Sequence, residues 1–147
     1  MATRTERRVL PLSLQQAFAL VADVEKYPQF VPFVRSVSIV SRNGNALVVD
    51  MLVGLGPIQR KVRSDAVLVA PERIDIVSTD WPFRRFNLQW RLEPAPAGGT
   101  VAELSGTFEI ASAVIARLVD RHAGNMVPMM VAAFERRAAE VARNAAP

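Results

Sequence analysis

Six short segments in which apolar and polar residues alternate follow one another between residues 36 and 110, and they restrict the fold more than any other feature. Successive side chains of a strand point to opposite faces, so each segment predicts a half-buried β-strand. The connections are too short for the crossover helices of a parallel sheet, so the segments predict an antiparallel meander. Their ranges are Ser36–Arg42, Ala46–Leu55, Ile58–Val69, Arg73–Thr79, Arg85–Glu93 and Thr100–Ile110.

A strand and a helix are predicted before this meander. Residues Thr5–Leu10 predict an opening strand, and Ser13 and Gln16 then have the spacing of a helix capping box. Apolar residues recur at helical spacing as far as Asp23, where the helix should end.

Helical spacing returns in the last third of the chain, from Ser112 to Arg143. Gly124 and Pro128 interrupt the apolar stripe, and proline inside a helix removes a hydrogen bond, so we expect a kink or break near residues 124–128. The elements together predict an α+β fold, in which a curved antiparallel sheet of about six to seven strands surrounds one long terminal helix. We expect a single domain over residues 1–147.

The connector between the first helix and the meander, DVEKYPQFVPF at residues 23–33, places three aromatic residues beside two prolines. Pro28 and Pro32 do not suit the interior of a regular helix. Tyr27, Phe30 and Phe33 should therefore lie on a short, stiff segment, which could close one end of an apolar cavity.

The two-residue period of the strands assigns one face of each strand to the interior. This inner set is apolar except for Ser64, and Arg60 shares its parity near the start of a strand. Ser64 could bond to backbone or water, and the long stem of Arg60 could reach the rim; alternatively, both are polar handles for a ligand with a polar head. The inner set comprises Leu47, Val49, Met51, Val53, Leu55, Ile58, Val62, Ser64, Ala66, Leu68, Phe86, Leu88, Trp90, Leu92, Ala102, Leu104, Gly106, Phe108 and Ile110.

The composition argues against several kinds of site. There is no cysteine, which excludes disulfides and thiolate zinc sites, and the single histidine, His122, cannot form a multi-histidine metal site. Asp50 lies on the outer face by parity, so we do not expect it to be catalytic. No apolar run approaches the roughly 18 residues of a membrane span, so we expect a cytoplasmic protein.

The chain is basic, with a formal charge of +4 and 16 arginines among its 18 basic residues. A basic balance favours an anionic partner such as RNA, the ribosome or acidic lipid. The basic residues are spread along the chain without long runs, however, which is also typical of a solvated surface.

Four segments of the chain resemble the coenzyme Q-binding proteins of the START-like (polyketide-cyclase-like) superfamily, which also includes bacterial ribosome-association toxins. They are DVEKYPQFVPF at 23–33, Ser64 after a GxGPI turn, WPFRRFNLQWRLEP at 81–94 and AFERRA at 133–138. The resemblance implies a helix-grip fold around a hydrophobic tunnel. It also implies ubiquinone or a similar polyprenyl quinone as the ligand, rather than as a cofactor, and a role as a lipid carrier or chaperone in respiration. Pro128 departs from the pattern, because a helix breaker is not expected there.

Parity and resemblance together predict the residues that line the tunnel, with no catalytic residue, no metal ligand and no cofactor among them. The terminal-helix motif maps to Phe134 and Arg137. The predicted ligand-binding residues are Val21, Tyr27, Phe30, Phe33, Val49, Met51, Val62, Ser64, Phe83, Phe86, Leu88, Trp90, Leu104, Phe108, Met126, Met130 and Phe134.

Three functions are consistent with the sequence. The favoured one is non-enzymatic binding of a polyprenyl quinone, with peripheral contact with the inner membrane as a further expectation. The alternative is a toxin-like protein that binds the large (50S) ribosomal subunit and blocks subunit association. A polyketide cyclase or dehydratase is less favoured, because it would need an acid–base pair inside the cavity. No DNA partner is expected.

Overall fold

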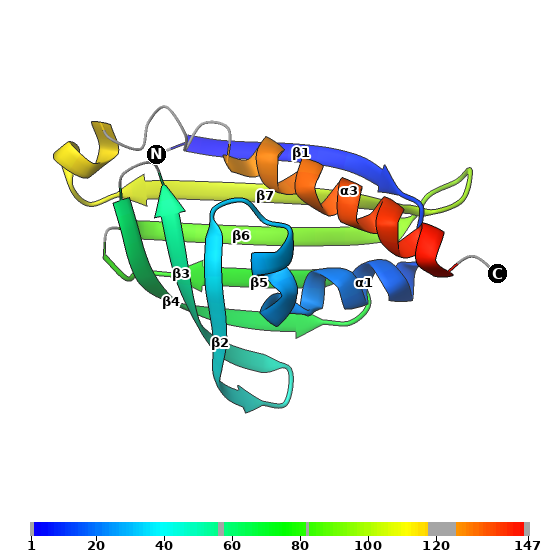
Figure 1. Ribbon diagram of the computed structural model, residues 1–147, viewed down its shortest axis with the longest axis horizontal. Helices are drawn as coiled ribbons and strands as arrows, with labels where there is room; N and C mark the ends of the chain where they lie inside the picture. The colour runs from blue at the N-terminus through cyan, green and yellow to red at the C-terminus, as the bar shows by residue number, and fades with distance from the viewer. Residues whose placement is uncertain (1, 56–57, 82, 118–125, 146–147) are drawn as a thin grey trace.

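A seven-stranded antiparallel sheet curves around a C-terminal helix in the computed structural model of the chain, which describes residues 2–55, 58–81, 83–117 and 126–145 (Figure 1). The strand order is β1-β7-β6-β5-β4-β3-β2, so strands that follow one another from β2 to β7 are also neighbours in the sheet. This arrangement confirms the predicted meander and the α+β fold class. The strands are β1 (Ala2–Leu10), β2 (Val34–Asn43), β3 (Ala46–Leu55), β4 (Ile58–Val69), β5 (Arg73–Ser78), β6 (Phe83–Pro94) and β7 (Thr100–Ile110).

Four strands agree closely with the sequence pattern in their bounds, whereas β2 and β6 each extend beyond the predicted range at both ends. The ranges of β3, β4 and β7 are those predicted, and β5 ends one residue earlier. The opening strand is longer than predicted, because β1 pairs with β7 from Leu10 back to Ala2. Main-chain pairing with a neighbouring strand therefore extends β1 beyond the residues that the sequence pattern predicted.

The first helix, α1 (Leu14–Ala22), begins with the predicted capping box. The main-chain N–H of Gln16 donates to the Ser13 hydroxyl at 3.2 Å, and the N–H of Ser13 donates to the Gln16 side chain at 3.0 Å. Asp23 caps the other end, as predicted. The connector then forms a short 3-10 helix, η1 (Val24–Gln29), which contains Pro28. The prolines thus prevent a continuous α-helix, as the sequence indicated.

The terminal helix, α3 (Met126–Ala145), lies across the concave face of the sheet (Figure 1). Pro128 is its third residue. In the first turn a main-chain N–H has no partner within the helix, so proline is tolerated there and α3 continues through Pro128. The predicted kink or break near residues 124–128 stays a prediction, because Gly124, like His122, lies outside the described residues. Residues 113–117 are also helical.

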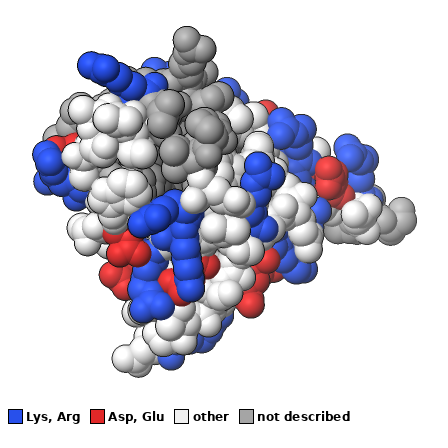
Figure 2. Space-filling model, turned by 60° about the vertical axis from the view of Figure 1, so that its left-hand side comes forward, with Lys and Arg blue, Asp and Glu red and all other residues white. Residues whose placement is uncertain are grey.

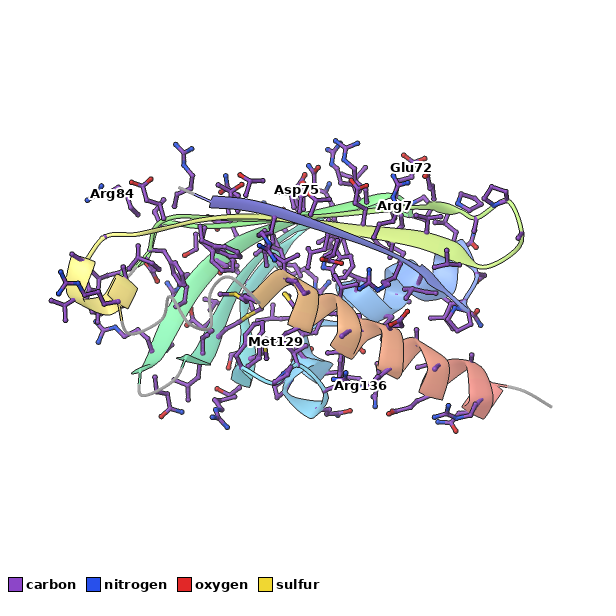
Figure 3. The ribbon with its side chains drawn as sticks, turned by 90° about the horizontal axis from the view of Figure 1, so that it is seen from above. Arg7, Glu72, Asp75, Arg84, Met129 and Arg136 are labelled. Atoms are coloured by element: carbon purple, nitrogen blue, oxygen red, sulfur yellow. The ribbon has the colours of Figure 1, made fainter. Side chains whose placement is uncertain are left out.

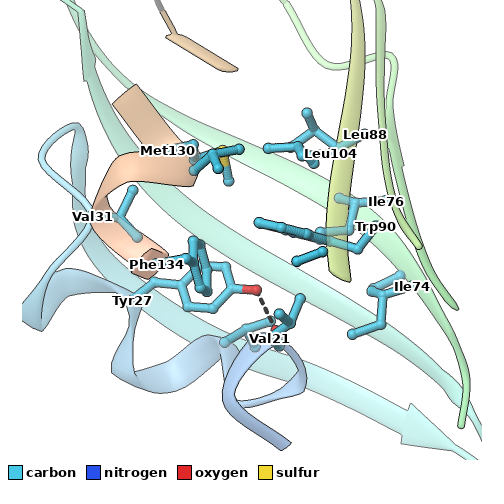
Figure 4. Packing of buried hydrophobic residues seen from close by; sticks show 14 of the residues in the cluster. Val21, Tyr27, Val31, Ile74, Ile76, Leu88, Trp90, Leu104, Met130 and Phe134 are labelled. Carbon is cyan, nitrogen blue, oxygen red and sulfur yellow. Dashed lines mark hydrogen bonds between the residues drawn. The ribbon is translucent and has the colours of Figure 1, made fainter. Parts of the chain in front are cut away.

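The two faces of the sheet differ as the parity predicted. The inner residues Leu88, Trp90 and Leu104 are buried against α3 (Figure 4). On the other face, Arg7, Glu72 and Asp75 project away from the helix (Figure 3). The side chains of Leu55 and Ile58, both predicted to face inward, lie outside the description.

Candidate ligand-binding cavity

An apolar cavity of about 40 Å³ lies between the curved sheet and the first turns of α3. Strands β3 to β6 form one wall, α3 forms the opposite wall, and the connector closes the side. The residues around it are Tyr27, Phe33, Val34, Met51, Val53, Val62, Ser64, Ile76, Phe83, Phe86, Leu88, Met126 and Met130.

The register of the sheet places this cavity beside the end of β5. Strand β5 pairs with β4 only from Asp65 to Val69, whereas β4 itself begins at Ile58. The inner-face residues Val62 and Ser64 thus precede the part of β4 that pairs with β5. The side chains at this end of the sheet leave a small cavity, whereas side chains fill the remainder of the core.

Aromatic rings fill the interior beyond the cavity. The Phe134 ring of α3 lies 4.9 Å from the Trp90 ring, 5.2 Å from the Tyr27 ring and 4.9 Å from the Phe30 ring, measured between centroids and all edge to face. Trp90 is 1% exposed, and its indole N–H has no hydrogen-bond partner within the described part of the chain. These contacts hold the connector against α3, and Figure 4 shows Tyr27, Trp90 and Phe134 packed together.

Two hydroxyl groups, of Tyr27 and Ser64, belong to residues of the cavity wall. The Tyr27 hydroxyl donates to the main-chain carbonyl of Val21. Burial, with a smaller effect of the Asp23 carboxylate, raises the pKa of Tyr27 well above its usual value, so the phenol stays protonated. The hydroxyl of Ser64, in contrast, has no hydrogen-bond partner among the residues that the structure describes. Ser64 is therefore the polar group left to receive the polar end of a ligand.

A family model described as polyketide cyclase / dehydrase and lipid transport matches residues 10–135. The chain belongs to this family. Ribosome association toxin RatA of Rickettsia prowazekii is 27% identical over 138 residues, which cover 91% of this chain and 94% of the toxin. Coenzyme Q-binding protein COQ10 homolog B of Xenopus laevis is 26% identical over 141 residues, which cover 93% of this chain but only 58% of that protein.

Solved structures of START-like proteins have the same fold. A START superfamily protein from Mycobacterium smegmatis superposes with a TM-score of 0.82 at 17% identity, covering 95% of this chain and 98% of that one. The Zhui aromatase/cyclase from Streptomyces sp. R1128 superposes with a TM-score of 0.70 at 19% identity, covering 97% of this chain and 88% of the enzyme. At these identities the likeness shows the helix-grip fold, which confirms the fold that the sequence resemblance implied.

The wall of the cavity includes most of the predicted ligand-binding residues. Ten of them lie on the cavity wall: Tyr27, Phe33, Met51, Val62, Ser64, Phe83, Phe86, Leu88, Met126 and Met130. The structure places the other seven away from the cavity: Val21, Phe30, Val49, Trp90, Leu104, Phe108 and Phe134.

Packing between distant elements explains these departures. Trp90, Leu104 and Phe134 fill the core against one another, and Phe30 lies on the far side of Phe134, where Arg137 covers its ring at 5.3 Å. The placement of Phe30 on the cavity is therefore corrected: it supports the connector from behind.

The sequence prediction missed three wall residues, Val34, Val53 and Ile76. Val53 has the inner parity already assigned to β3, and Ile76 alternates with Ile74 on β5, so period-two counting could have found both. Val34 stands where the connector enters β2, and no pattern in the sequence marks it.

Charged groups on the sheet are arranged for ion pairs rather than for acid–base chemistry in the cavity. Asp50 lies on the outer face, where Arg63 binds both its oxygens at 2.8 and 3.0 Å and Lys61 lies at 3.4 Å. Hydrogen bonds from Arg63, opposed by burial, lower the pKa of Asp50 to about 2. Within the described ranges, no group of three potential metal ligands comes together. No described helix is long and apolar enough to cross a membrane.

A wider groove of about 430 Å³ lies on the outside of the sheet, around Arg7, Arg91 and Glu103. Arg7 and Glu103 form a salt bridge at 3.0 Å there, and Arg91 donates to Gln89 at 2.8 Å. Paired charges of both signs are typical of a solvated surface, so the smaller apolar cavity is the better candidate site.

Proposed function

We propose that this protein binds a hydrophobic molecule with a polar head in the cavity between the sheet and α3, and that the ligand is a polyprenyl quinone such as ubiquinone. The observation that carries this proposal is the apolar wall, in which the hydroxyl of Ser64 has no hydrogen-bond partner among the described residues. The family description, which includes lipid transport, and the coenzyme Q-binding relative support the same class of ligand.

Burial of an apolar chain supplies the binding energy without any charged group. Each Å² of apolar surface removed from water contributes about 25 cal/mol. Because the cavity measures about 40 Å³ and pockets for drug-sized ligands usually measure about 300–1,000 Å³, the walls must separate when the ligand binds. Met51, Met126 and Met130 are suited to this, since unbranched thioether chains repack easily.

The role that we propose is that of a lipid carrier or chaperone supporting respiratory electron transport, not that of an enzyme. An acid–base mechanism needs a titratable pair at the substrate. Among the described wall residues, Tyr27 is the titratable one, and its hydroxyl is held by Val21. Collecting and delivering a quinone would also require peripheral contact with the inner membrane, which we retain as a prediction.

Lipid extraction followed by mass spectrometry tests the proposal. The protein is purified from its own cells without detergent, its organic extract is compared with that of a Leu88→Asp variant, and both are then offered ubiquinone homologues. We expect a quinone in the wild-type extract and little in the variant, because a carboxylate on the wall opposes an apolar chain. A wild-type protein that neither carries nor takes up a quinone contradicts the proposal.

A second candidate function is binding to the large ribosomal subunit. The observation that favours it is the RatA relative, which this chain matches over 94% of the toxin's length. The formal charge of +4 is also suited to rRNA phosphates. Sedimentation of ribosomal subunits with added protein decides this: a lower yield of joined subunits, weakening steeply with salt, would support it. A profile unchanged at any protein concentration would exclude it.

A further inference from the structure

Arg60 stands at the edge of the cavity on the cavity-facing side of β4. It pairs across the strands with Val53 and shares its face with Val62, and both of these residues line the cavity. Its own side chain is exposed. An exposed side chain next to two wall residues marks the boundary between the apolar interior and water.

The guanidinium of Arg60 is held in place by an aromatic ring rather than by an acid. Its central carbon lies 4.6 Å from the centre of the Trp81 ring, between β5 and β6. Trp81 is itself 47% exposed, an unusual position for a large apolar side chain. Stacking orders the planar guanidinium and leaves its in-plane N–H donors available to a carboxylate or phosphate.

The neighbouring basic residues are paired with acids, whereas Arg60 has no such partner in the described part of the chain. Lys61 and Arg63 both pair with Asp50, and Arg84 pairs with Glu109 at 3.2 Å. In the described ranges, no carboxylate forms a salt bridge with Arg60. Basic and acidic side chains are interspersed over the face that Figure 2 shows. The feature that distinguishes Arg60 is its contact with the Trp81 ring.

Another cation–π pair, between Arg137 and Phe30, provides a comparison, because this arginine has a structural role. Arg137 lies over Phe30, but it also donates to Gln29 at 2.9 Å and pairs with Glu140 at 3.5 Å. Its donors are therefore engaged within the protein. The comparison distinguishes Arg60 as a stacked, exposed cation whose N–H donors have no hydrogen-bond partner among the described residues.

We propose that Arg60, held by Trp81, binds the anionic head of an amphiphile whose apolar chain occupies the cavity. The chemical class is a single apolar chain that ends in a carboxylate or a phosphate monoester. This inference rests on the proposed binding of an apolar chain in the cavity, and not on the quinone, whose head carries no charge for Arg60 to bind. Ser64 lies four residues further along β4 on the same face and would meet the atoms between the head and the chain.

Two probes with the same chain test the proposal: farnesyl phosphate and farnesol, measured by calorimetry at low salt. We expect the wild type to bind the phosphate about 10-fold or more tightly than the alcohol, a difference of about 1.4 kcal/mol. Arg60→Gln should abolish this preference and leave farnesol binding unchanged. Arg42→Gln, which removes an exposed charge at the far end of β2, should keep it. Inorganic phosphate alone should not compete at millimolar concentration.

A second readout does not depend on the variants folding. The chain has two tryptophans, so its NMR spectrum should contain two indole N–H signals. One comes from the exposed Trp81 and the other from the buried Trp90. Farnesyl phosphate should move the Trp81 signal, and farnesol should move it less. Equal affinity for the two probes, or a preference that survives Arg60→Gln, overturns the proposal while the cavity function stands.

Two further outcomes are also decisive. If the wild type binds neither probe, the cavity function and the head-group site both fail. If the Trp81 signal responds to phosphatidylglycerol vesicles but not to farnesyl phosphate, Arg60 contacts a bilayer surface, and the head-group site is wrong.

Discussion

The hydroxyl of Tyr27 donates a hydrogen bond to the main-chain carbonyl of Val21, and this bond ties the connector to the last turn of α1. Tyr27 is 1% exposed, and its ring packs edge-on against Phe134 of α3. One side chain therefore joins the connector, the first helix and the terminal helix at the base of the cavity.

Replacing Tyr27 with phenylalanine should lower the free energy of unfolding by about 1–3 kcal/mol, because the buried carbonyl of Val21 loses its donor while the ring stays in place. Denaturation with urea measures the change. Phe33→Leu, a conservative change of a half-buried wall residue, is the control and should have a smaller effect. An unfolding free energy equal to that of the wild type would show that water replaces the lost donor.

Stability should also fall steeply in alkaline solution through the same residue. Burial raises the pKa of Tyr27, so the unfolded chain loses this proton near pH 10 while the folded chain keeps it. The contribution of Tyr27 to the free energy of unfolding is thus fully present below pH 10. Above pH 10 it declines by about 1.4 kcal/mol per pH unit. Tyr27 is the chain's one tyrosine, so absorbance at alkaline pH reports it directly. The phenol should ionise together with unfolding, and Tyr27→Phe should lack this part of the pH dependence.

Asp50→Asn should reduce thermal stability at neutral pH, since the bidentate contact with Arg63 and the contact with Lys61 lose their charge. The pKa of Asp50 is lowered to about 2, below its ordinary value of 3.8, so its contribution is present above pH 4 and is lost as the pH falls through 2. Melting curves of wild type and variant should differ at pH 7 and converge near pH 2. The control is Asp65→Asn, because Asp65 lies on the same face of β4 as Arg63. A constant difference at every pH would contradict the ionic explanation.

Phe33 and Phe30 should respond differently to aspartate, although both belong to the aromatic connector. Phe33 is half-buried on the cavity wall, so Phe33→Asp should release the ligand from a protein that stays folded. Phe30 packs against Tyr27, Phe134 and Arg137, so Phe30→Asp should lower stability by about 2–3 kcal/mol. Melting curves and lipid retention, measured together, separate the two effects. If Phe33→Asp retains its lipid, the connector does not close the cavity.

Gly106→Ala should destabilise the protein because Val127 of α3 packs directly against Gly106 of β7. An added Cβ would lie 2.7 Å from a methyl carbon of Val127 and 3.0 Å from the Phe108 ring. Overpacking of this kind costs about 1–3 kcal/mol. Val127→Ala removes the clashing methyl group, so the double variant should be less destabilised than the sum of the two single ones. Simple additivity would show that the helix moves away instead.

Side-chain alternation and local capping were sufficient to predict most of the secondary structure. The period of two along β3, β4 and β7 reflects the geometry of a pleated strand, and the Ser13–Gln16 capping box is a bond between near neighbours. Such features depend on a few consecutive residues, so they can be read directly from the chain. A helix start is less easily predicted: Pro128 was expected to interrupt a helix, and it lies in the third position of α3 as described.

The sequence by itself determined which residues face inward and that the inner surface is apolar. Only the tertiary structure decided which of them border empty space, because that depends on side chains brought together from distant parts of the chain. Phe134 packs against both Trp90 and Phe30, whereas beside the end of β5 no ring from the described residues fills the space at Ser64 in the same way. The stacking of Arg60 on Trp81 is likewise a contact between β4 and the connection from β5 to β6, and the sequence around either residue does not predict it.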